Sequence, residues 1–112
     1  MVKEAYITHE TSVLLKEKGF NEPCTGLSRI LCKDGEHPVL EITQQKAAAW
    51  LREQNNLYIE IRVDFSDGVY PMYDAFIINL KSCDRYSVLG YDRYSYYDAV
   101  ETSLKYCLTK LL

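Results

Sequence analysis

A tyrosine-rich segment near the C-terminus carries the residue types with which this chain could do chemistry. Between Gly90 and Leu108, in the stretch GYDRYSYYDAVETSLKYCL, five of nineteen residues are tyrosine. Tyrosine offers a large contact area at small entropic cost and arginine adds planar hydrogen bonding, so both are enriched at protein interfaces. The candidate interaction surface, in and just before this segment, consists of Arg85, Tyr86, Tyr91, Arg93, Tyr94 and Tyr96.

Three interpretations of this surface stay open. The tyrosines can cover a small sheet, contact another protein, or stack on the bases of single-stranded nucleic acid. The acids Asp84, Asp92 and Asp98 lie among the arginines and weaken the attraction that nucleic-acid binding requires. We therefore expect a non-enzymatic protein that binds a partner protein, with single-stranded nucleic-acid binding as the alternative.

Residues suited to catalysis or metal binding are scarce. The two histidines, His9 and His37, suggest no arrangement of nucleophile, base and orienting group. Cys24, Cys32 and His37 are near one another and of types that bind zinc, but their spacings match no zinc knuckle and a fourth ligand is missing. We predict no catalytic residue, no metal and no cofactor, and four reduced cysteines, since none forms a CxxC pair.

Length and composition indicate one soluble domain. A chain of 112 residues suits one hydrophobic core, so residues 1–112 are expected to form a single globular domain. The first fifteen residues include acids and a histidine where a signal peptide has an apolar run, and no stretch approaches the ~20 apolar residues of a membrane span. The expected location is the cytoplasm, with no membrane contact.

Charge argues against binding to duplex nucleic acid. The net charge is −3, and acids and bases mix in both halves of the chain, with eight acids and seven bases in residues 1–56 and eight and six in residues 57–112. Because no basic tail could make many phosphate contacts, duplex binding is disfavoured.

A first helix is expected over residues 9–18. Thr8 can accept hydrogen bonds from first-turn amides as the N-cap, and Gly19 tolerates the left-handed conformation of a helix C-terminus. The pattern directs Val13 and Leu14 toward the core.

Two further helices are expected, one after Thr43 and one after Ser95. On the second helix, Ala47, Trp50, Leu51 and Gln54 share one face, and Trp50 is read as a core anchor. On the third, Ser95 and Asp98 have capping-box spacing, and an apolar stripe runs to the C-terminus. That stripe consists of Tyr97, Val100, Leu104, Cys107, Leu108 and Leu111, with Tyr106 off its centre.

Alternating residues predict a sheet between these helices. Every second residue from Leu57 to Phe65 is apolar, which is typical of a strand with one buried face. An antiparallel strand is expected at residues 73–81 and a short third one at 85–89, while residues 29–32 and 37–42 are expected to pair as an irregular hairpin.

The order of these elements predicts an α+β fold. We expect an antiparallel sheet of three to five strands with about three helices packed on one face. An exposed edge of such a sheet can pair with a second copy across a two-fold axis, so a homodimer is a further prediction.

Three stretches resemble a known family. ITHETSVLLKEKGFNEPC, AAAWLREQNNLYIEI and YYDAVETSLKYCLTKLL are together similar to a group of small uncharacterised proteins encoded by gut anaerobic bacteria, their prophages and mobile elements. The resemblance covers nearly the whole chain. It implies a small accessory protein of phage-like or mobile-element origin in a bacterial host, and it assigns no activity, cofactor or site residue.

Overall fold

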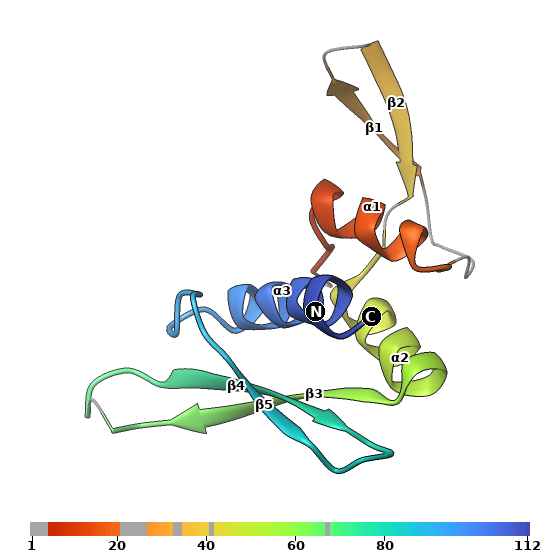
Figure 1. The fold of residues 1–112 in the computed structure, drawn as a ribbon. Coiled ribbons are helices and arrows are strands. Elements are labelled where there is room, and N and C mark those ends of the chain that lie inside the picture. The colour runs from red at the N-terminus through yellow and green to blue at the C-terminus, as the bar shows by residue number, and fades with distance from the viewer. Residues whose placement is uncertain (1–4, 21–26, 33–34, 41, 67) are drawn as a thin grey trace.

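The computed structural model describes residues 5–20, 42–66 and 68–112, and the backbone of residues 27–32 and 35–40. These residues form an α+β arrangement, as the sequence predicted (Figure 1). The elements in chain order are α1 (His9–Glu17), β1 (Leu27–Cys32), β2 (Gly35–Leu40), α2 (Gln44–Asn55), β3 (Leu57–Asp64), β4 (Met72–Asn79), β5 (Arg85–Val88), α3 (Tyr96–Tyr106) and a π-helical turn (Cys107–Leu111).

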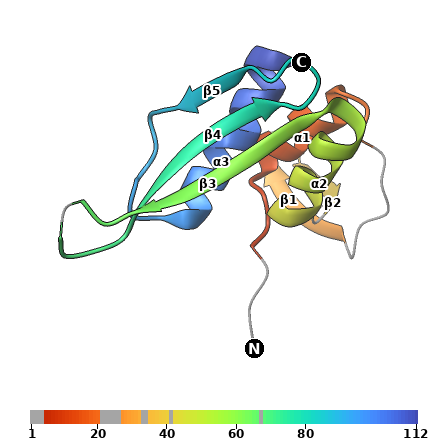
Figure 2. The same ribbon diagram turned by 90° about the horizontal axis from the view of Figure 1, so that it is seen from below.

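The main sheet is antiparallel, with the strand order β3-β4-β5. Helices α2 and α3 contact one face of this sheet, and α1 packs on α3. Figure 2 looks onto the opposite face, which no helix of the described residues covers. The predicted hairpin in the first half of the chain is confirmed in its backbone, but β1 and β2 form a separate two-stranded sheet, with Ile30 opposite His37.

The core lies between the sheet and its two covering helices. Leu51 of α2, Ile77 of β4 and Leu104 of α3 are fully buried there. Trp50 is confirmed as a core residue, and its ring meets Phe20 edge to face at 5.6 Å between centroids. The burial of these large side chains supplies most of the driving force for folding.

All three predicted N-caps are confirmed. The side chains of Thr8, Thr43 and Ser95 each accept a hydrogen bond from the amide three residues later. The capping box at Ser95 is incomplete, because the Asp98 carboxylate accepts from the Asp92 amide at 2.7 Å instead of returning to Ser95. Asp98 therefore orders the loop that enters α3.

The predicted buried faces of α1 and α2 are partly wrong. Val13 is 42% exposed, whereas Thr11 and Leu15, one turn apart, are fully buried because they face α3. On α2, Gln54 is exposed and Gln44 is buried, with its amide donating to the Tyr97 carbonyl at 2.9 Å. On α2 the predicted Ala47, Trp50 and Leu51 are buried, and on α1 the predicted Leu14 packs against the core, so the errors are confined to Val13 and Gln54.

The apolar stripe of α3 is confirmed from Val100 to Leu108 but not at its start. Tyr97 was expected to extend it, yet its side chain is 53% exposed and lines a groove. At the other end, Tyr106 is half-buried, with its ring 6.5 Å from that of Tyr86. The first turn of α3 therefore contributes side chains to the surface.

The predicted buried face of β3 is also only partly covered. Exposure rises from 3% at Leu57 to 54% at Val63 and 69% at Phe65, with Ile59 and Ile61 in between. The reason is visible in Figure 2, where the β3–β4 hairpin runs out beyond the helices.

In the part of the chain that is described, no helix is long and apolar enough to cross a membrane.

Candidate functional site

The six residues of the sequence-predicted surface do not form one surface. Arg85 and Tyr86 are neighbours on β5, and successive side chains of a strand point to opposite faces. Tyr86 faces the helices and packs against the core, whereas Arg85 lies over Phe76 on the other face of the sheet. The alternation of side chains along β5 therefore places Arg85 and Tyr86, two of the six predicted residues, on opposite faces of the sheet.

Arg85 belongs to a cluster on the uncovered face of the sheet. Its guanidinium carbon lies 4.0 Å from the Phe76 ring centroid, and that of Arg62 lies 5.2 Å away. Glu60 accepts hydrogen bonds from Arg62 at 2.6 Å and from Arg85 at 3.3 Å. The two cations thus cover Phe76 and share one carboxylate, an arrangement that shields an apolar ring from water.

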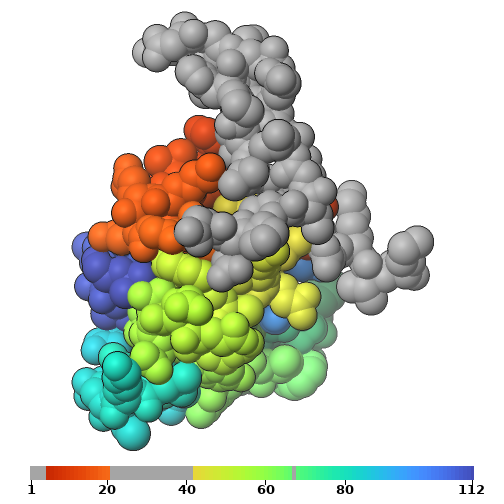
Figure 3. All heavy atoms as spheres, turned by 90° about the vertical axis from the view of Figure 1, so that its right-hand side faces the viewer, coloured from red at the N-terminus to blue at the C-terminus, as the bar shows by residue number. Residues whose placement is uncertain are grey.

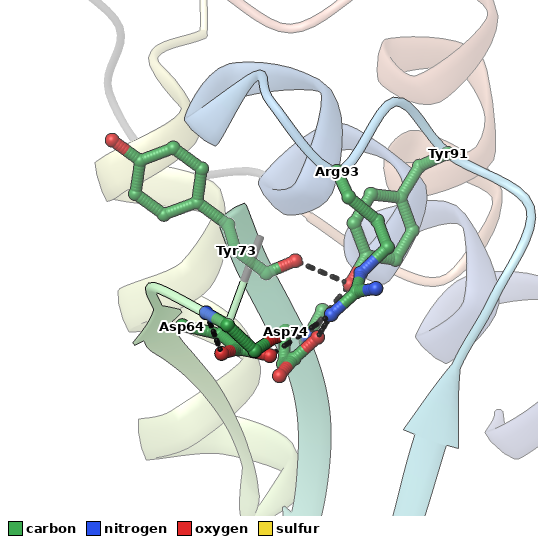
Figure 4. A network of polar contacts seen from close by, with 7 residues as sticks. Asp64, Tyr73, Asp74, Tyr91 and Arg93 are labelled. Atoms are coloured by element: carbon green, nitrogen blue, oxygen red, sulfur yellow. Dashed lines mark hydrogen bonds and ion pairs between the residues drawn. The ribbon is translucent and has the colours of Figure 1, made fainter. Parts of the chain in front are cut away.

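Tyr91 completes the hydrogen bonding of β4 (Figure 4). β5 pairs with β4 only as far as Val88 opposite Ala75. Beyond that point the Tyr91 hydroxyl accepts from the Ala75 amide at 2.8 Å and donates to the Tyr73 carbonyl at 2.9 Å. These bonds satisfy backbone groups that would otherwise lack a partner strand, so Tyr91 has a structural role.

Arg93 ties the same loop to the ends of β3 and β4. Its guanidinium bonds to the carboxylates of Asp74, in a very short contact, and Asp64, at 3.4 Å, and its carbonyl accepts from the Tyr73 amide at 2.7 Å. The hydrogen bond to Asp74 raises the pKa of Arg93. The pKa of Asp64 is lowered, first by the Ser66 amide and then by the charge of Arg93. Arg93 is thus already engaged by acids of its own chain.

Tyr94 and Tyr96 remain as exposed residues, and Tyr97 joins them. The Tyr96 ring is edge to face with those of Tyr73, at 5.7 Å, and Tyr97, at 5.8 Å. These contacts hold the aromatic side chains in place at the start of α3. A preordered aromatic surface loses little entropy when a ligand binds.

A groove beside these tyrosines was not foreseen from the sequence. Its volume is about 400 Å³, and it opens between α2, the inner face of β3 and the start of α3. Figure 3 views the molecule from the α2 side, where the start of α3, in blue, is seen between α2 and the β3–β4 hairpin. The residues that line this β3 groove are Ala5, Thr43, Gln44, Gln45, Ala48, Arg52, Ile59, Ile61, Tyr96, Tyr97 and Val100.

The lining of the β3 groove combines apolar and polar side chains with one cation. Ile59, Ile61 and Val100 supply aliphatic surface, and Arg52 is the one charged residue among those that line it. Arg52 lies 3.5 Å from Glu53, but both side chains are largely exposed, and pairs of this kind contribute little. The guanidinium therefore remains available to a carboxylate.

One sequence signal for the groove was present in β3. The apolar alternation runs from Leu57 to Phe65, and α2 and α3 cover only its first part, since Val63 and Phe65 are exposed. The contribution of Arg52 had no such signal, because a single arginine on an exposed helix face is common in any soluble protein.

The two cysteines whose side chains are described, Cys83 and Cys107, give no sign of a reactive site. Cys107 is fully buried in the core, and this burial raises the pKa of its thiol to about 12. Cys83 is exposed in the turn between β4 and β5. Cys24 and the side chains of Cys32 and His37, the three zinc candidates, lie outside the described residues; among the residues that are described, no cluster of three metal-binding side chains occurs.

Comparison of the chain with protein-family models, with curated proteins and with solved structures found no match.

Proposed function

We propose that this protein is a non-enzymatic accessory protein that binds a partner protein through the β3 groove. The observation that carries the proposal is the apolar stripe of β3, whose residues become progressively exposed between Leu57 and Val63. Apolar surface that continues from a core into a groove is typical of an interaction site. A partner that covers this stripe would complete the burial that α2 and α3 begin.

The tyrosines at the start of α3 support the same proposal. Tyr96 and Tyr97 line the groove, and Tyr73, beside Val63 on the neighbouring strand, supports Tyr96. Residues that dominate binding energy at interfaces are commonly aromatic and already fixed in position. Of the six residues predicted from the sequence, Tyr96 is the one that lines the groove.

The proposed contact therefore differs from the surface predicted from sequence. Tyr91 and Arg93 bond to β4 and its neighbours, and Tyr86 packs against the core, which favours a structural role for these three residues. Tyr94 is exposed but does not line the groove.

Binding of single-stranded nucleic acid stays a second candidate, supported by Phe76 and its two arginines on the uncovered sheet face. Such proteins combine stacking side chains with a positively charged groove. Here Arg85 already lies over the Phe76 ring, and Glu60 neutralises part of the charge of both arginines. The uncovered face therefore favours this function less than the β3 groove favours protein binding.

The proposed setting is the cytoplasm of a bacterial host, with a phage or mobile element as the origin of the chain. It rests on the family resemblance of the sequence. This proposed setting does not depend on the groove. It bears on which protein the partner is, and not on how the partner binds.

Site-specific crosslinking tests the proposed function. A photoreactive benzoylphenylalanine replaces Tyr97, at the groove, or Tyr58, an exposed tyrosine on β3, in cells of the native host. Both variants are irradiated, and adducts are treated with nuclease and identified by mass spectrometry.

We expect a discrete protein adduct from position 97 that is stronger than any adduct from position 58, because Tyr58 lies on the outer face of β3. Equal adducts from both positions, or none from position 97, would refute binding at the groove. A nuclease-sensitive adduct from position 58 would favour the nucleic-acid alternative.

A further inference from the structure

The edge of β3 adds a second recognition element beside the groove. β3 is an outer strand of the sheet, and among the described residues only β4 pairs with it. An outer strand presents amide and carbonyl groups of alternate residues to whatever lies beside it. Its eight residues, LYIEIRVD, contain no lysine and no proline, and its charged residues Glu60, Arg62 and Asp64 lie on the outer face, away from the groove.

The opposite edge of the sheet is less suited to pairing. β5 has four residues, and beyond Val88 the Tyr91 hydroxyl and the Arg93 carbonyl occupy backbone groups of β4. The two edges therefore differ, and the longer one lies next to the groove.

We infer that the partner contributes an extended segment that pairs antiparallel with β3 and places its side chains in the β3 groove. This inference rests on the proposed function and names the kind of partner segment. Backbone pairing would supply affinity, and side chains at alternate positions would supply specificity, as in other cases of strand addition. An antiparallel arrangement is the more common one between neighbouring strands.

The spacing of residues on the inner face of β3 defines an apolar pattern for this segment. Ile59 and Ile61, which line the groove, and Val63, the next residue on the same face, follow one another about 7 Å apart. A paired strand repeats that spacing, so its first and third residues reach the groove while the second points to the other face. The segment should therefore carry two apolar residues separated by one residue.

The charge of Arg52 in the β3 groove indicates where the partner segment should carry an acidic residue. Arg52 lies on the last turn of α2, close to the beginning of β3, and no acidic residue lines the groove. An antiparallel segment runs from the Val63 end toward the Ile59 end, so its later residues approach Arg52. The expected order is apolar, any residue, apolar, any residue, acid, where the acid is Asp, Glu or a C-terminal carboxylate.

Peptide display on the immobilised full chain tests this pattern. The library contains random linear peptides, and recovered sequences are aligned and measured individually by fluorescence anisotropy. We expect enrichment of the pattern above and a loss of affinity of at least about tenfold with the Val63→Lys variant and with Arg52→Glu. The Tyr58→Lys variant, altered on the other face of β3, should bind nearly as well as the wild type.

Methylation of the peptide backbone separates strand addition from simple filling of the groove. Each amide of the best peptide is methylated in turn, which removes one hydrogen-bond donor. Strand addition predicts that every second methylation weakens binding by at least about tenfold, with the intervening ones tolerated. Sensitivity without this alternation would overturn the inference.

Other outcomes distinguish this inference from the proposed function. Peptides with apolar residues three and four apart, dependent on Val63, would show that the groove binds a helix; strand addition would then be wrong and the proposed function would stand. Failure to enrich any peptide that depends on the groove would overturn the inference, while the crosslinking result would still decide the proposed function. A wild-type dimer that Val63→Lys dissociates would show that a second copy occupies the edge, which also overturns the inference.

Discussion

The Tyr91 hydroxyl occupies the place that a neighbouring strand would otherwise take beside β4. It accepts from one backbone amide and donates to one carbonyl, while the aromatic ring packs against the core. The hydroxyl thus replaces one carbonyl and one amide of a neighbouring strand. Its loss should therefore lower the stability of the fold more than the loss of a hydroxyl from an exposed tyrosine.

Replacement of Tyr91 by Phe should destabilise the protein by about 1–3 kcal/mol, because it leaves the Ala75 amide and the Tyr73 carbonyl without this partner. Urea unfolding followed by circular dichroism measures the change. Tyr58→Phe, on an exposed side chain, is the matched control and should alter stability by less than about 0.5 kcal/mol. Equal effects of the two substitutions would contradict the role of Tyr91.

The buried thiol of Cys107 should make stability depend on pH in the alkaline range. Its pKa is raised from 9.0 to about 12 by desolvation, so the folded state holds the proton more tightly than the unfolded state. The resulting stability is present below pH 9 and is lost as the pH rises toward 12. Between pH 9 and pH 10 the loss attributable to this thiol is about 1 kcal/mol.

Urea unfolding at these two pH values measures the loss. Cys107→Ala should show a shallower decline in stability than the wild type, whereas Cys83→Ser, at an exposed cysteine, should keep the full decline. Parallel declines in all three proteins would show that Cys107 does not contribute.

At the scale of elements, a buried carboxylate connects α3 to the start of α1. Glu101 is buried on α3, and one of its oxygens accepts from the Thr8 amide at 2.5 Å. In a capping box the side chain of a Glu or Gln at the third helical position accepts this hydrogen bond from the N-cap amide. That position of α1 is Thr11. Glu101 therefore supplies from another helix what α1 lacks in its own sequence.

Substitution of Glu101 by Ala should cost about 1–3 kcal/mol, since a partly buried amide loses a charged acceptor at a helix N-terminus. Glu101→Gln keeps an acceptor oxygen and should cost less. Thermal unfolding of both variants measures the difference. An Ala variant as stable as the wild type would contradict the proposed bridge between the helices.

The elements themselves were largely predictable, because their signals are local. The caps at Thr8, Thr43 and Ser95, the alternation of β3 and the turns between strands depend on residues only a few positions apart. Which face of a helix is buried depends instead on its neighbours in space. Val13 and Gln54 were therefore assigned to the wrong face.

The candidate site was less predictable for the same reason. The sequence singled out the tyrosine-rich segment, but nothing local distinguishes Tyr91, which bonds to β4, from Tyr96, which lines the groove. The groove combines residues of α2, β3 and α3 that range from Gln44 to Val100. Only the packing of these elements places Arg52 and Tyr97 on the same cavity.

At the scale of the whole molecule, the two faces of the main sheet differ in what covers them. The outer face has a charged cluster in which Glu60 holds Arg62 and Arg85 over Phe76. The inner face is covered by α2 and α3 at one end and leaves an apolar stripe at the other. This asymmetry leads us to place the partner on the inner face of β3, and a homodimer through that edge stays a competing prediction.

The most direct test compares two lysine substitutions on β3 for binding to the partner identified by crosslinking. Val63→Lys alters the inner, groove-side face, and Tyr58→Lys alters the outer face of the same strand; both side chains are exposed, so both variants should fold. Titration calorimetry should show affinity reduced at least about tenfold by Val63→Lys and nearly unchanged by Tyr58→Lys. Equal affinities for the two variants would contradict the assignment of the β3 groove as the binding site.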